Sequence, residues 1–408
     1  MKSPPNRAAI SYWHLTRNAY HKTYDAAERG RDRSIPCYDE MATMNRRRFL
    51  DTFFTLLKAS LVASALPAWA YASVTDVKEA LSLHYKPLNG RSLREIARCK
   101  EHHGSGRFLN PLGLDRSGRL LKVLSWKLFH RNRFEEDLER QPVVPVSVDW
   151  EPLRRPEGLS ITYLKHASLM IQDAGSRMLL DPVFSSPFWF MRDFTPLNFD
   201  PSQMLAPEHV LLTHGHYDHF DTSSLAQLPP DTHVIAPPGY ADLLDEVGLR
   251  RRTTLDWYES YRDGEREIIL LPCNHWTMRN PVAGPNLGLW GSYLIRTATG
   301  PTIYVSGDTA YFDGFDQIGE QFDIDLAVFN LGAYEPRWFM APSHIDPHET
   351  VQAFRELKAK KLMIMHWGSF RLGDEPVHLP PQHLRDEMQR AGLLNRLVDW
   401  KHGETLVV

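Results

Sequence analysis

Four side chains that can bind a metal ion lie within six positions of one another in the stretch HVLLTHGHYDHFD, residues 209–221. They are His214, His216, Asp218 and His219, and they come directly after a short apolar run that predicts a strand. Imidazole and carboxylate groups are the usual protein ligands of zinc. Because so dense a polar cluster is costly to bury without partners, the stretch predicts a metal site.

The spacing within this stretch indicates how two ions could be bound. Alternate residues of an extended segment point to the same side, so His214 and His216 can hold one ion together. Asp218 and His219 come on the following turn, where they can face a second ion nearby. Gly215 permits the tight approach of the backbone that this arrangement needs.

Three further candidate ligands each follow a predicted apolar strand. They are His275, Asp308 and His366, which come after the runs 268–271, 302–305 and 362–365. A layered α/β fold places its chemistry at strand ends, so these side chains can complete a site of two ions.

The elements that must position these residues begin at about residue 159. Short β-rich runs are separated there by Gly, Pro and Asp, and helical segments such as 240–246 and 348–359 lie between several of them. Many strands with interspersed helices predict an α/β layered fold. The sequence contains no glycine-rich phosphate loop, so a nucleotide cofactor has no support.

The composition is that of a globular protein, with 408 residues, 42% hydrophobic and 24% charged. Three cysteines exclude a disulfide scaffold in a chain this long. The net charge of −3 argues against broad electrostatic binding to nucleic acid. Through Ala72 there are 11 Lys+Arg against 6 Asp+Glu, whereas the remainder has 36 against 44 and holds 17 of the 19 histidines. The histidine enrichment therefore belongs to the acidic body of the protein.

Residues 44–72 have the order of an export signal. Three arginines at 46–48 precede a moderately apolar run, and alanine-x-alanine cleavage sites end it. The paired arginines followed by Phe-Leu resemble the twin-arginine signal of bacteria, so we expect export to the periplasm or cell envelope. A membrane anchor is the alternative, but charged residues and a proline keep the clean apolar run below the ~20 residues needed to span a bilayer.

Residues 1–43 are polar and irregular, which is unusual upstream of a signal. We interpret them as a leader that is disordered or not native. We expect translation to start at Met41 or Met44.

The remaining chain divides into two predicted parts. Residues 73–155 form an N-terminal extension that packs on the core, and residues 156–408 form the main domain. Within the extension, 120–130 has apolar residues at helical spacing and predicts an amphipathic helix. This helix packs on the main domain or, alternatively, contacts lipid.

The motif HxHxDH, then a single His, a Gly-Asp pair and a last His, resembles the metallo-β-lactamase fold superfamily. The resemblance implies that 156–408 form a catalytic α/β domain with four layers, αββα, in which two mixed β-sheets are covered by outer helices. It implies two ions, expected to be zinc, with iron or manganese as alternatives. The implied ligands are His214, His216 and His275 for one ion, Asp218, His219 and His366 for the other, and Asp308 bridging both together with a water or hydroxide. Two cations ~3.5–4 Å apart lower the pKa of such a water and make it a nucleophile.

The sequence around the ligands is similar to the N-acylphosphatidylethanolamine-hydrolysing phospholipase D group of this superfamily. The similar motifs are YLKHAS at 163–168, LDPVFS at 180–185, PCNHW at 272–276, LWGS at 289–292, GAYEPRWFM at 332–340, HIDP at 344–347 and HWGSF at 366–370. The resemblance implies a phosphodiesterase that acts on N-acyl phosphatidylethanolamine, a related phospholipid or another small phosphodiester. Metal-held hydroxide would attack phosphorus, with Asp218 and Asp308 among the catalytic residues. Cys273-Asn274 before His275 departs from the group's pattern without affecting the ligand.

The same resemblance implies a role for His344, which is not a ligand. We expect it to contact the substrate phosphate or to act as general acid. The alternative is a surface residue in front of a helix capped by Asp346.

Four further residues are candidates for the substrate side of the site. His166 is expected to orient a ligand, and Tyr217 to line the pocket. Phe188 and Trp189 belong to an aromatic stretch that forms either part of the core or an apolar lip resting on lipid, which would give a peripheral membrane contact.

Two other functions stay open. One is a metal-dependent lactonase or esterase of the same superfamily, and the other is a non-catalytic metal-binding envelope protein. The full ligand set disfavours the second, because a scaffold needs no open metal position. Cys99 and Cys273 could pair in an oxidising compartment, but we interpret them as free thiols. The oligomeric state is left open.

Overall fold

The structure, a computed structural model, describes residues 84–114, 131–139, 141–154 and 157–408. The leader at 1–43, its two candidate start sites, the export signal at 44–72 and the amphipathic helix at 120–130 lie outside the described residues. Within the described part, no helix is both long and apolar enough to cross a membrane.

The first sheet has seven strands in the hydrogen-bonded order β13-β1-β2-β3-β4-β5-β6. The pairs from β13 to β3 are antiparallel and those from β3 to β6 are parallel, so the sheet is mixed. Its strands are β1 (Leu159–Lys165), β2 (Ser168–Asp173), β3 (Ser176–Leu180), β4 (His209–Leu211), β5 (His233–Ala236), β6 (Arg252–Thr254) and β13 (Thr405–Val407).

The second sheet has six strands in the order β12-β11-β10-β9-β8-β7. It is also mixed, because β10, β11 and β12 pair parallel while the pairs from β7 to β10 are antiparallel. Its strands are β7 (Ser260–Asp263), β8 (Arg266–Leu271), β9 (Ser292–Arg296), β10 (Thr302–Val305), β11 (Leu326–Asn330) and β12 (Lys361–Met365).

Alternate side chains of the first sheet enter two different cores, because successive residues of a strand point to opposite faces. Leu169 and Ile171 join the core that is shared with the second sheet. Met170 and Leu179 join a separate cluster that also contains Leu225 of α9. One face of the sheet therefore packs on the other sheet, and the opposite face packs on helices.

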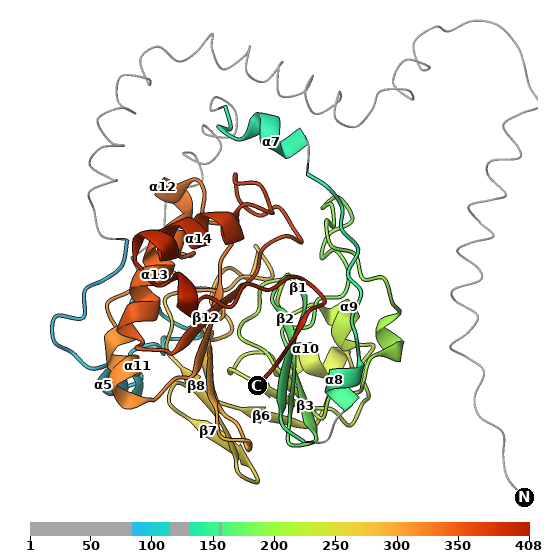
Figure 1. Ribbon diagram of the computed structural model, residues 1–408. Coiled ribbons are helices and arrows are strands. Elements are labelled where there is room, and N and C mark those ends of the chain that lie inside the picture. Colours follow the sequence, from blue (N-terminus) through green and yellow to red (C-terminus); the bar gives the residue numbers. More distant parts are fainter. Residues whose placement is uncertain (1–83, 115–130, 140, 155–156) are drawn as a thin grey trace, which may run out of the picture. The chain divides into compact units, whose positions relative to one another are not determined.

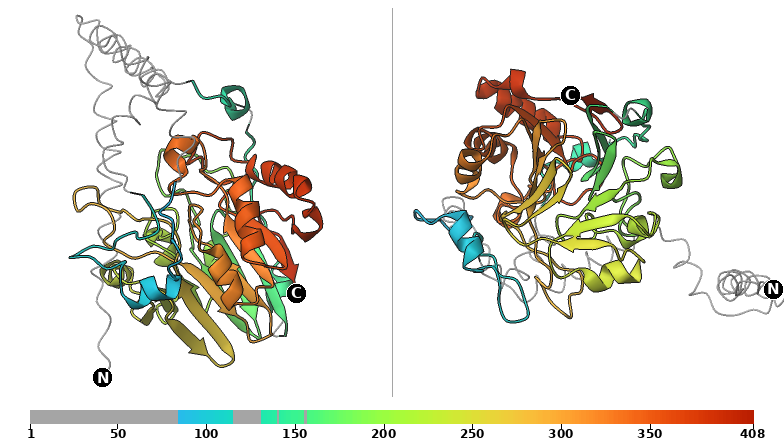
Figure 2. Two further views of the ribbon diagram at one scale, coloured as in Figure 1. Left: turned by 90° about the vertical axis from the view of Figure 1, so that its left-hand side faces the viewer. Right: turned by 90° about the horizontal axis from the view of Figure 1, so that it is seen from below.

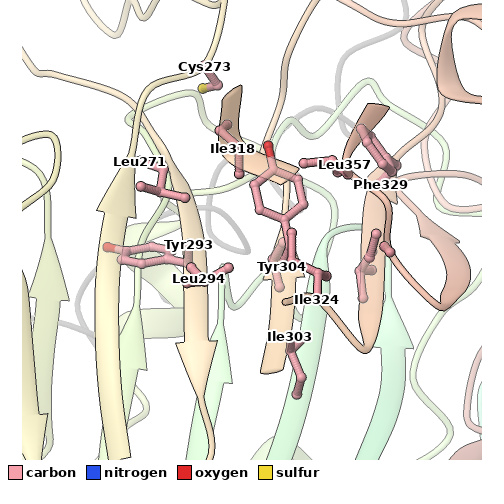
Figure 3. Packing of buried hydrophobic residues seen from close by; sticks show 14 of the residues in the cluster. Leu271, Cys273, Tyr293, Leu294, Ile303, Tyr304, Ile318, Ile324, Phe329 and Leu357 are labelled. Carbon is pink, nitrogen blue, oxygen red and sulfur yellow. The ribbon is translucent and has the colours of Figure 1, made fainter. Parts of the chain in front are cut away.

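Helices cover the outer faces of both sheets (Figures 1 and 2). The short helices α8 (Glu151–Arg154), α9 (Thr222–Leu225) and α10 (Ala241–Glu246) pack on the first sheet. The helices α11 (Phe315–Gln321), α13 (Pro347–Glu356) and α14 (Pro380–Arg390) pack on the second, where Ile318 and Leu357 lie beside Tyr304 and Phe329 (Figure 3). The remaining elements are α5 (Leu93–Arg98), α7 (Glu135–Glu139), α12 (Arg337–Met340) and 3-10 turns at Pro201–Gln203 and Leu394–Arg396. The four-layered αββα architecture is thereby confirmed.

Residues 84–114 pack beside the second sheet. Leu93 of α5 is fully buried in the shared core, and its backbone N–H donates to Gln317 Oε1 of α11 at 2.8 Å. Cys99, just after α5, is exposed and Cys273 is buried, and both thiols are free. The disulfide alternative is therefore not realised between them.

Asp256 holds the same segment in place through contacts with Lys100, His102 and His103. Its carboxylate lies 2.5 Å from His102 Nε2 and 2.7 Å from His103 Nε2, and it accepts a hydrogen bond from Lys100 Nζ at 2.7 Å. Two histidines and an aspartate could hold a metal ion. The Lys100 ammonium already supplies a positive charge here, so we interpret the group as an ion-paired anchor.

Candidate metal centre

The first ligand motif lies in the loop directly after β4, a buried strand hydrogen-bonded between β3 and β5. The sheet therefore fixes the point at which the loop begins. A Cβ atom added at Gly215 would lie 2.5 Å from the Tyr240 ring and 2.9 Å from Thr277 Oγ1, so only glycine fits. His214 and His219 are buried, and His216 is half-buried.

One group of ligand atoms comes from His214, His216, His275 and Asp308, all within 4.8 Å of one another. His216 Nδ1 lies 2.9 Å from His214 Nε2 and 3.2 Å from His275 Nε2. Asp308 Oδ2 lies 3.8 Å from Nε2 of His214 and 3.8 Å from Nε2 of His275. The side chains come from the ends of β4, β8 and β10, as the sequence pattern predicted.

A second group comes from Asp218, His219 and His366, together with His166. His219 Nε2 and His366 Nε2 are 3.1 Å apart, and Asp218 Oδ2 lies 3.4 Å from His366 Nε2. Asp308 reaches this group as well, with Oδ2 at 3.2 Å from His219 Nε2 and Oδ1 at 3.3 Å from His366 Nε2. Asp308 thus lies between the two groups, and all seven predicted ligands are brought together.

Hydrogen bonds on the far side of the rings indicate which nitrogen carries the proton. His275 Nδ1 lies 3.0 Å from the carbonyl oxygen of Ser343. His219 Nδ1 lies 2.8 Å from Asp181 Oδ2. A carbonyl or carboxylate oxygen only accepts, so Nδ1 is a donor in both rings and Nε2 is the nitrogen that can bind a metal ion.

His214 has the same arrangement. Its Nδ1 lies 3.0 Å from Thr213 Oγ1, whose own proton is donated to Asp181 Oδ2 at 2.6 Å. His216 Nδ1 therefore faces Nε2 of both His214 and His275. A single proton on His216 cannot form good hydrogen bonds to both of these nitrogen atoms, whereas a cation between the three rings can bind all of them. This set of nitrogen atoms therefore fits a bound metal ion.

The protonation states agree with this interpretation. Burial lowers the pKa of His214 well below its usual value, so the ring is neutral, which is the form that binds metals. Burial opposes ionisation of Asp308, but His219 and His366 together hold the pKa of its carboxyl well below the usual range. Burial opposes protonation of His219, but Asp308 and Asp218 raise the pKa of this ring well above its usual value, so the ring holds a proton that a bound metal ion would displace. The site therefore combines a neutral His214 with a negative carboxylate at its centre.

His166 contacts the second group. Its Nε2 lies 2.9 Å from Asp218 Oδ2, and its ring centroid lies 4.1 Å from that of His366. Burial, followed by the charge of His366, lowers the pKa of His166 to about 3. A neutral ring in this place can donate to Asp218, which is the contact that a ligand-orienting residue needs.

Two residues with positioning contacts were not predicted from the sequence. Asp181, directly after β3, accepts hydrogen bonds from Thr213 and from His219. Asn330, the last residue of β11, donates from Nδ2 to Asp308 Oδ1 at 2.8 Å. Both are polar residues at the end of a buried strand. The same pattern identified the ligands, so it could also have marked these two residues as candidates.

His344 lies at the edge of the site. Its Nδ1 is 3.9 Å from Asp308 Oδ2, and its ring centroid is 5.5 Å from that of His275. Only 14% of its side chain is exposed, so the ring lies largely buried beside the ligands. Arg337 of α12 donates to the His344 carbonyl at 2.8 Å and holds this segment in place, while Asp346 does cap α13.

The aromatic residues divide between the core and the surface. The Tyr217 ring lies 5.1 Å from that of Phe188, which stacks on Phe190 at 5.3 Å. Trp189 is 78% exposed and Phe190 is 62% exposed, whereas Phe184 is buried. The core alternative therefore holds for Phe184 but not for Trp189.

The similarity of this chain to known proteins agrees with a metal site at these residues. Residues 176–367 match the family model described as the beta-lactamase superfamily domain. This match spans just under half of the chain. Together with the two mixed sheets and the His/Asp groups, it indicates that this part of the chain resembles the metallo-β-lactamase superfamily and its metal-dependent hydrolases. Within that superfamily it resembles the N-acyl-phosphatidylethanolamine-hydrolysing phospholipase D group.

Two curated relatives carry that description. "N-acyl-phosphatidylethanolamine-hydrolyzing phospholipase D 1" of Caenorhabditis elegans is 27% identical over 292 residues, which cover 67% of this chain and 82% of the relative. The mitochondrial enzyme of the same description from Saccharomyces cerevisiae is 30% identical over 245 residues, 57% of this chain, and the match spans only 52% of that relative. A solved structure, "a possible metal-dependent hydrolase from Veillonella parvula DSM 2008", superimposes with a TM-score of 0.51 at 17% identity over 62% of this chain and 100% of its own. That last similarity shows the fold alone.

Proposed function

We propose that the protein is a dinuclear zinc phosphodiesterase of the phospholipase D type, with N-acyl phosphatidylethanolamine or a related phospholipid as its substrate. The metal-dependent part of the proposal is supported by the convergence of the Nε2 atoms of His214, His219 and His275 around a buried carboxylate. The lipid part is supported by the two relatives described as hydrolysing this phospholipid and by the exposed aromatic side chains beside the site.

In this proposal each group of ligands holds one ion. The residues that would hold them are His214, His216 and His275 on one side, Asp218, His219 and His366 on the other, and Asp308 between them. Two bound cations supply charge neutralisation for a phosphoryl group and lower the pKa of a water molecule. Mixed His and Asp ligands suit zinc and are also compatible with iron or manganese, so the metal is identified in the test below.

Side chains of the protein supply the proton for the leaving group and hold the catalytic groups in orientation. In this proposal His344, whose Nδ1 lies 3.9 Å from Asp308 Oδ2, gives a proton to the leaving alcohol oxygen of the phosphodiester. Arg337 fixes the His344 carbonyl, and His166 fixes the Asp218 carboxylate. These contacts hold the proton donor and a ligand in position before substrate arrives.

Phe188, Trp189, Phe190 and Tyr217 form what we call the aromatic lip. Trp189 and Phe190 are mostly exposed, and Tyr217 lies within the first ligand motif. Exposed aromatic side chains beside a site favour contact with an apolar surface. We infer that the lip rests on the lipid surface, which makes the protein a peripheral membrane enzyme.

The proposal includes export to the bacterial periplasm or cell envelope, because residues 44–72 have the order of a twin-arginine signal. Such export carries folded proteins, so the metal site can be loaded before export. N-terminal sequencing of the natural product should find a mature start at the alanine-x-alanine sites of 68–72. A mature start before Met41 contradicts this part of the proposal.

The function is tested by metal analysis followed by a substrate panel. We expect about two metal ions per chain after native purification. N-acyl phospholipids, other phosphodiesters and lactones are then assayed with the wild type and with Asp308→Asn, which should lose phosphodiester turnover. A metal content below about one ion per chain contradicts the proposal, and so does turnover of lactones without turnover of phosphodiesters.

A further inference from the structure

The loop that carries the first ligand motif is held at both ends by one side chain. This loop, residues 214–220, is here called the metal-ligand loop. Arg279 Nη1 donates to the carbonyl oxygen of Phe220 at 2.6 Å and to that of Gly215 at 3.2 Å. The two carbonyl groups flank His216, Asp218 and His219, so one guanidinium joins the beginning of the loop to its end.

Tyr217, in the middle of the loop, makes a reciprocal contact. The guanidinium carbon of Arg279 lies 4.3 Å from the centroid of the Tyr217 ring. Tyr217 Oη donates to the backbone carbonyl of Arg279 at 2.6 Å. A planar guanidinium can stack on a ring and donate to carbonyl oxygens at the same time, which a lysine ammonium cannot do. The contact therefore depends on arginine at this position.

The segment that carries Arg279 is itself firmly held. Asn286 and Thr277 exchange hydrogen bonds of 2.7 and 3.1 Å across its base. Arg107, from the segment 84–114, donates to the carbonyl oxygens of Ala283 and Pro285 at 2.7 Å each. Arg279 thus extends from a hydrogen-bonded segment to the metal-ligand loop, which connects β4 to the buried Phe220 in front of α9.

We propose that Arg279 is a positioning residue that clamps the metal-ligand loop and thereby keeps the two ligand groups at the spacing that retains both ions. The inference rests on the metal centre of the proposed function and is independent of the substrate. It assigns a role to a residue that touches no ligand side chain in the contacts described above. Removing the clamp leaves the ligands in place but allows the loop to open, so bound metal leaves more easily.

The test measures how fast zinc is lost. Zinc-loaded full-length protein is mixed with excess chelator, and the appearance of chelated zinc is followed for the wild type, Arg279→Gln and Arg279→Lys. We expect Arg279→Gln to release zinc ~10–100-fold faster, the range typical of lost outer contacts at metal sites. Arg279→Lys should fall in between, because lysine keeps the charge and can donate to a carbonyl group but lacks the planar guanidinium that stacks on the Tyr217 ring. The absorption spectrum of the cobalt-substituted protein should change in the same order.

A matched control is Arg177→Gln. Arg177 is also half-buried and donates to a backbone carbonyl, that of Ala206 at 2.9 Å, but it lies before β4 rather than after it. Its variant should release zinc at the wild-type rate. If Arg279→Gln does not fold, Tyr217→Phe decides, because it removes a single hydrogen bond to Arg279 and should speed release with the circular dichroism unchanged.

Zinc release from folded Arg279→Gln at the wild-type rate overturns the clamp. An unchanged release rate combined with a raised KM for a phosphodiester also overturns it, because Arg279 would then serve the substrate. A wild-type protein that binds no zinc, iron or manganese contradicts the metal centre itself, and the clamp with it.

Discussion

At the scale of single residues, the oxygen atoms behind the ligand rings are as important as the ligands. Asp181 accepts from His219 Nδ1 and from both the backbone N–H and the hydroxyl of Thr213. Through these contacts one carboxylate fixes the proton positions of His219 and, through the threonine, of His214. Because of this arrangement, Nε2 is the nitrogen that each of the two rings turns towards the metal centre.

We therefore expect Asp181→Asn to weaken metal binding. The amide keeps one acceptor oxygen, but its NH₂ group faces a donor, so His219 loses its fixed tautomer. Zinc affinity, measured by competition with a chelator, should fall ~10–100-fold. Asp245→Asn, which changes an exposed aspartate paired with Arg252, is the control and should bind zinc as the wild type does. Unchanged affinity in Asp181→Asn contradicts the assigned role.

The variant His344→Gln tests whether His344 acts as a proton donor and not as a metal ligand. Because His344 is not a ligand, the variant should keep its metal, whereas kcat on a phosphodiester should fall by roughly 10²–10⁴, the usual contribution of a positioned acid or base. His348→Gln is the control, since that exposed residue lies on α13. Loss of metal, or an unchanged kcat, argues against a general acid at this position.

The limits of prediction from sequence are clearest at this scale. His214 and His216 could be predicted because their spacing within one extended segment is local information. The strand-end signal marks Asp181 and Asn330 as candidates but does not give their partners, because those contacts depend on which strands are neighbours. β3 lies beside β4, and β11 lies beside β10, only in the folded sheets.

At the scale of elements, the loop after β3 shows a different limit. Its aromatic residues were equally compatible with a core or with a lip, because composition does not determine which side of a loop faces the protein. The structure buries Phe184 and exposes Trp189. The alternation of apolar residues in the strands was more informative, since opposite faces of the first sheet do enter two different cores.

The double variant Phe188→Ala with Trp189→Ala tests the aromatic lip. Both side chains lie beside the ligand motif without belonging to it, so the chemistry of the site should survive. Activity on phospholipid vesicles should fall more than activity on a soluble phosphodiester, because only the vesicle requires contact with a surface. Val282→Ala, a change at a side chain that is 97% exposed outside the lip, is the matched control. An equal loss on both substrates argues against a lipid role.

The connection that leads into β13 should make stability depend on pH. The His402 ring stacks on Tyr163 of β1 at 4.4 Å, and its Nε2 lies 3.0 Å from the Trp367 carbonyl oxygen. Burial, reinforced by Lys165 and opposed by the carbonyl of Trp367, lowers the pKa of His402 to about 4. In the unfolded chain the imidazole titrates near its ordinary value, about 6.5.

The unfolded state therefore binds the proton more tightly than the folded state does. The stability that the neutral ring provides is complete above about pH 6.5 and is lost as the pH falls towards 4. His402→Gln should make the free energy of unfolding by urea less dependent on pH in this window than it is in the wild type. If the two proteins show the same slope, His402 is not the group responsible.

At the scale of the whole molecule, two sheets bring the ends of β4, β8, β10 and β12 to one place, and seven ligands from distant parts of the sequence meet there. The order of the motifs predicted this fold, because each ligand follows a strand. The sequence did not predict how residues 84–114 attach, since the ion-paired group around Asp256 joins side chains more than 150 positions apart. Such pairing across the chain has no local signal.

We propose that this protein hydrolyses the phosphodiester bond of an N-acylated phospholipid. The most direct measurement incubates the zinc-loaded protein with N-acyl phosphatidylethanolamine in water enriched in ¹⁸O and analyses the products by mass spectrometry. The proposal predicts N-acylethanolamine and phosphatidic acid with one ¹⁸O atom in its phosphate, because the water oxygen bonds to phosphorus while the bond from phosphorus to the ethanolamine oxygen breaks. A free fatty acid that carries the ¹⁸O atom, with no labelled phosphatidic acid, would show hydrolysis of an ester and contradict the proposal.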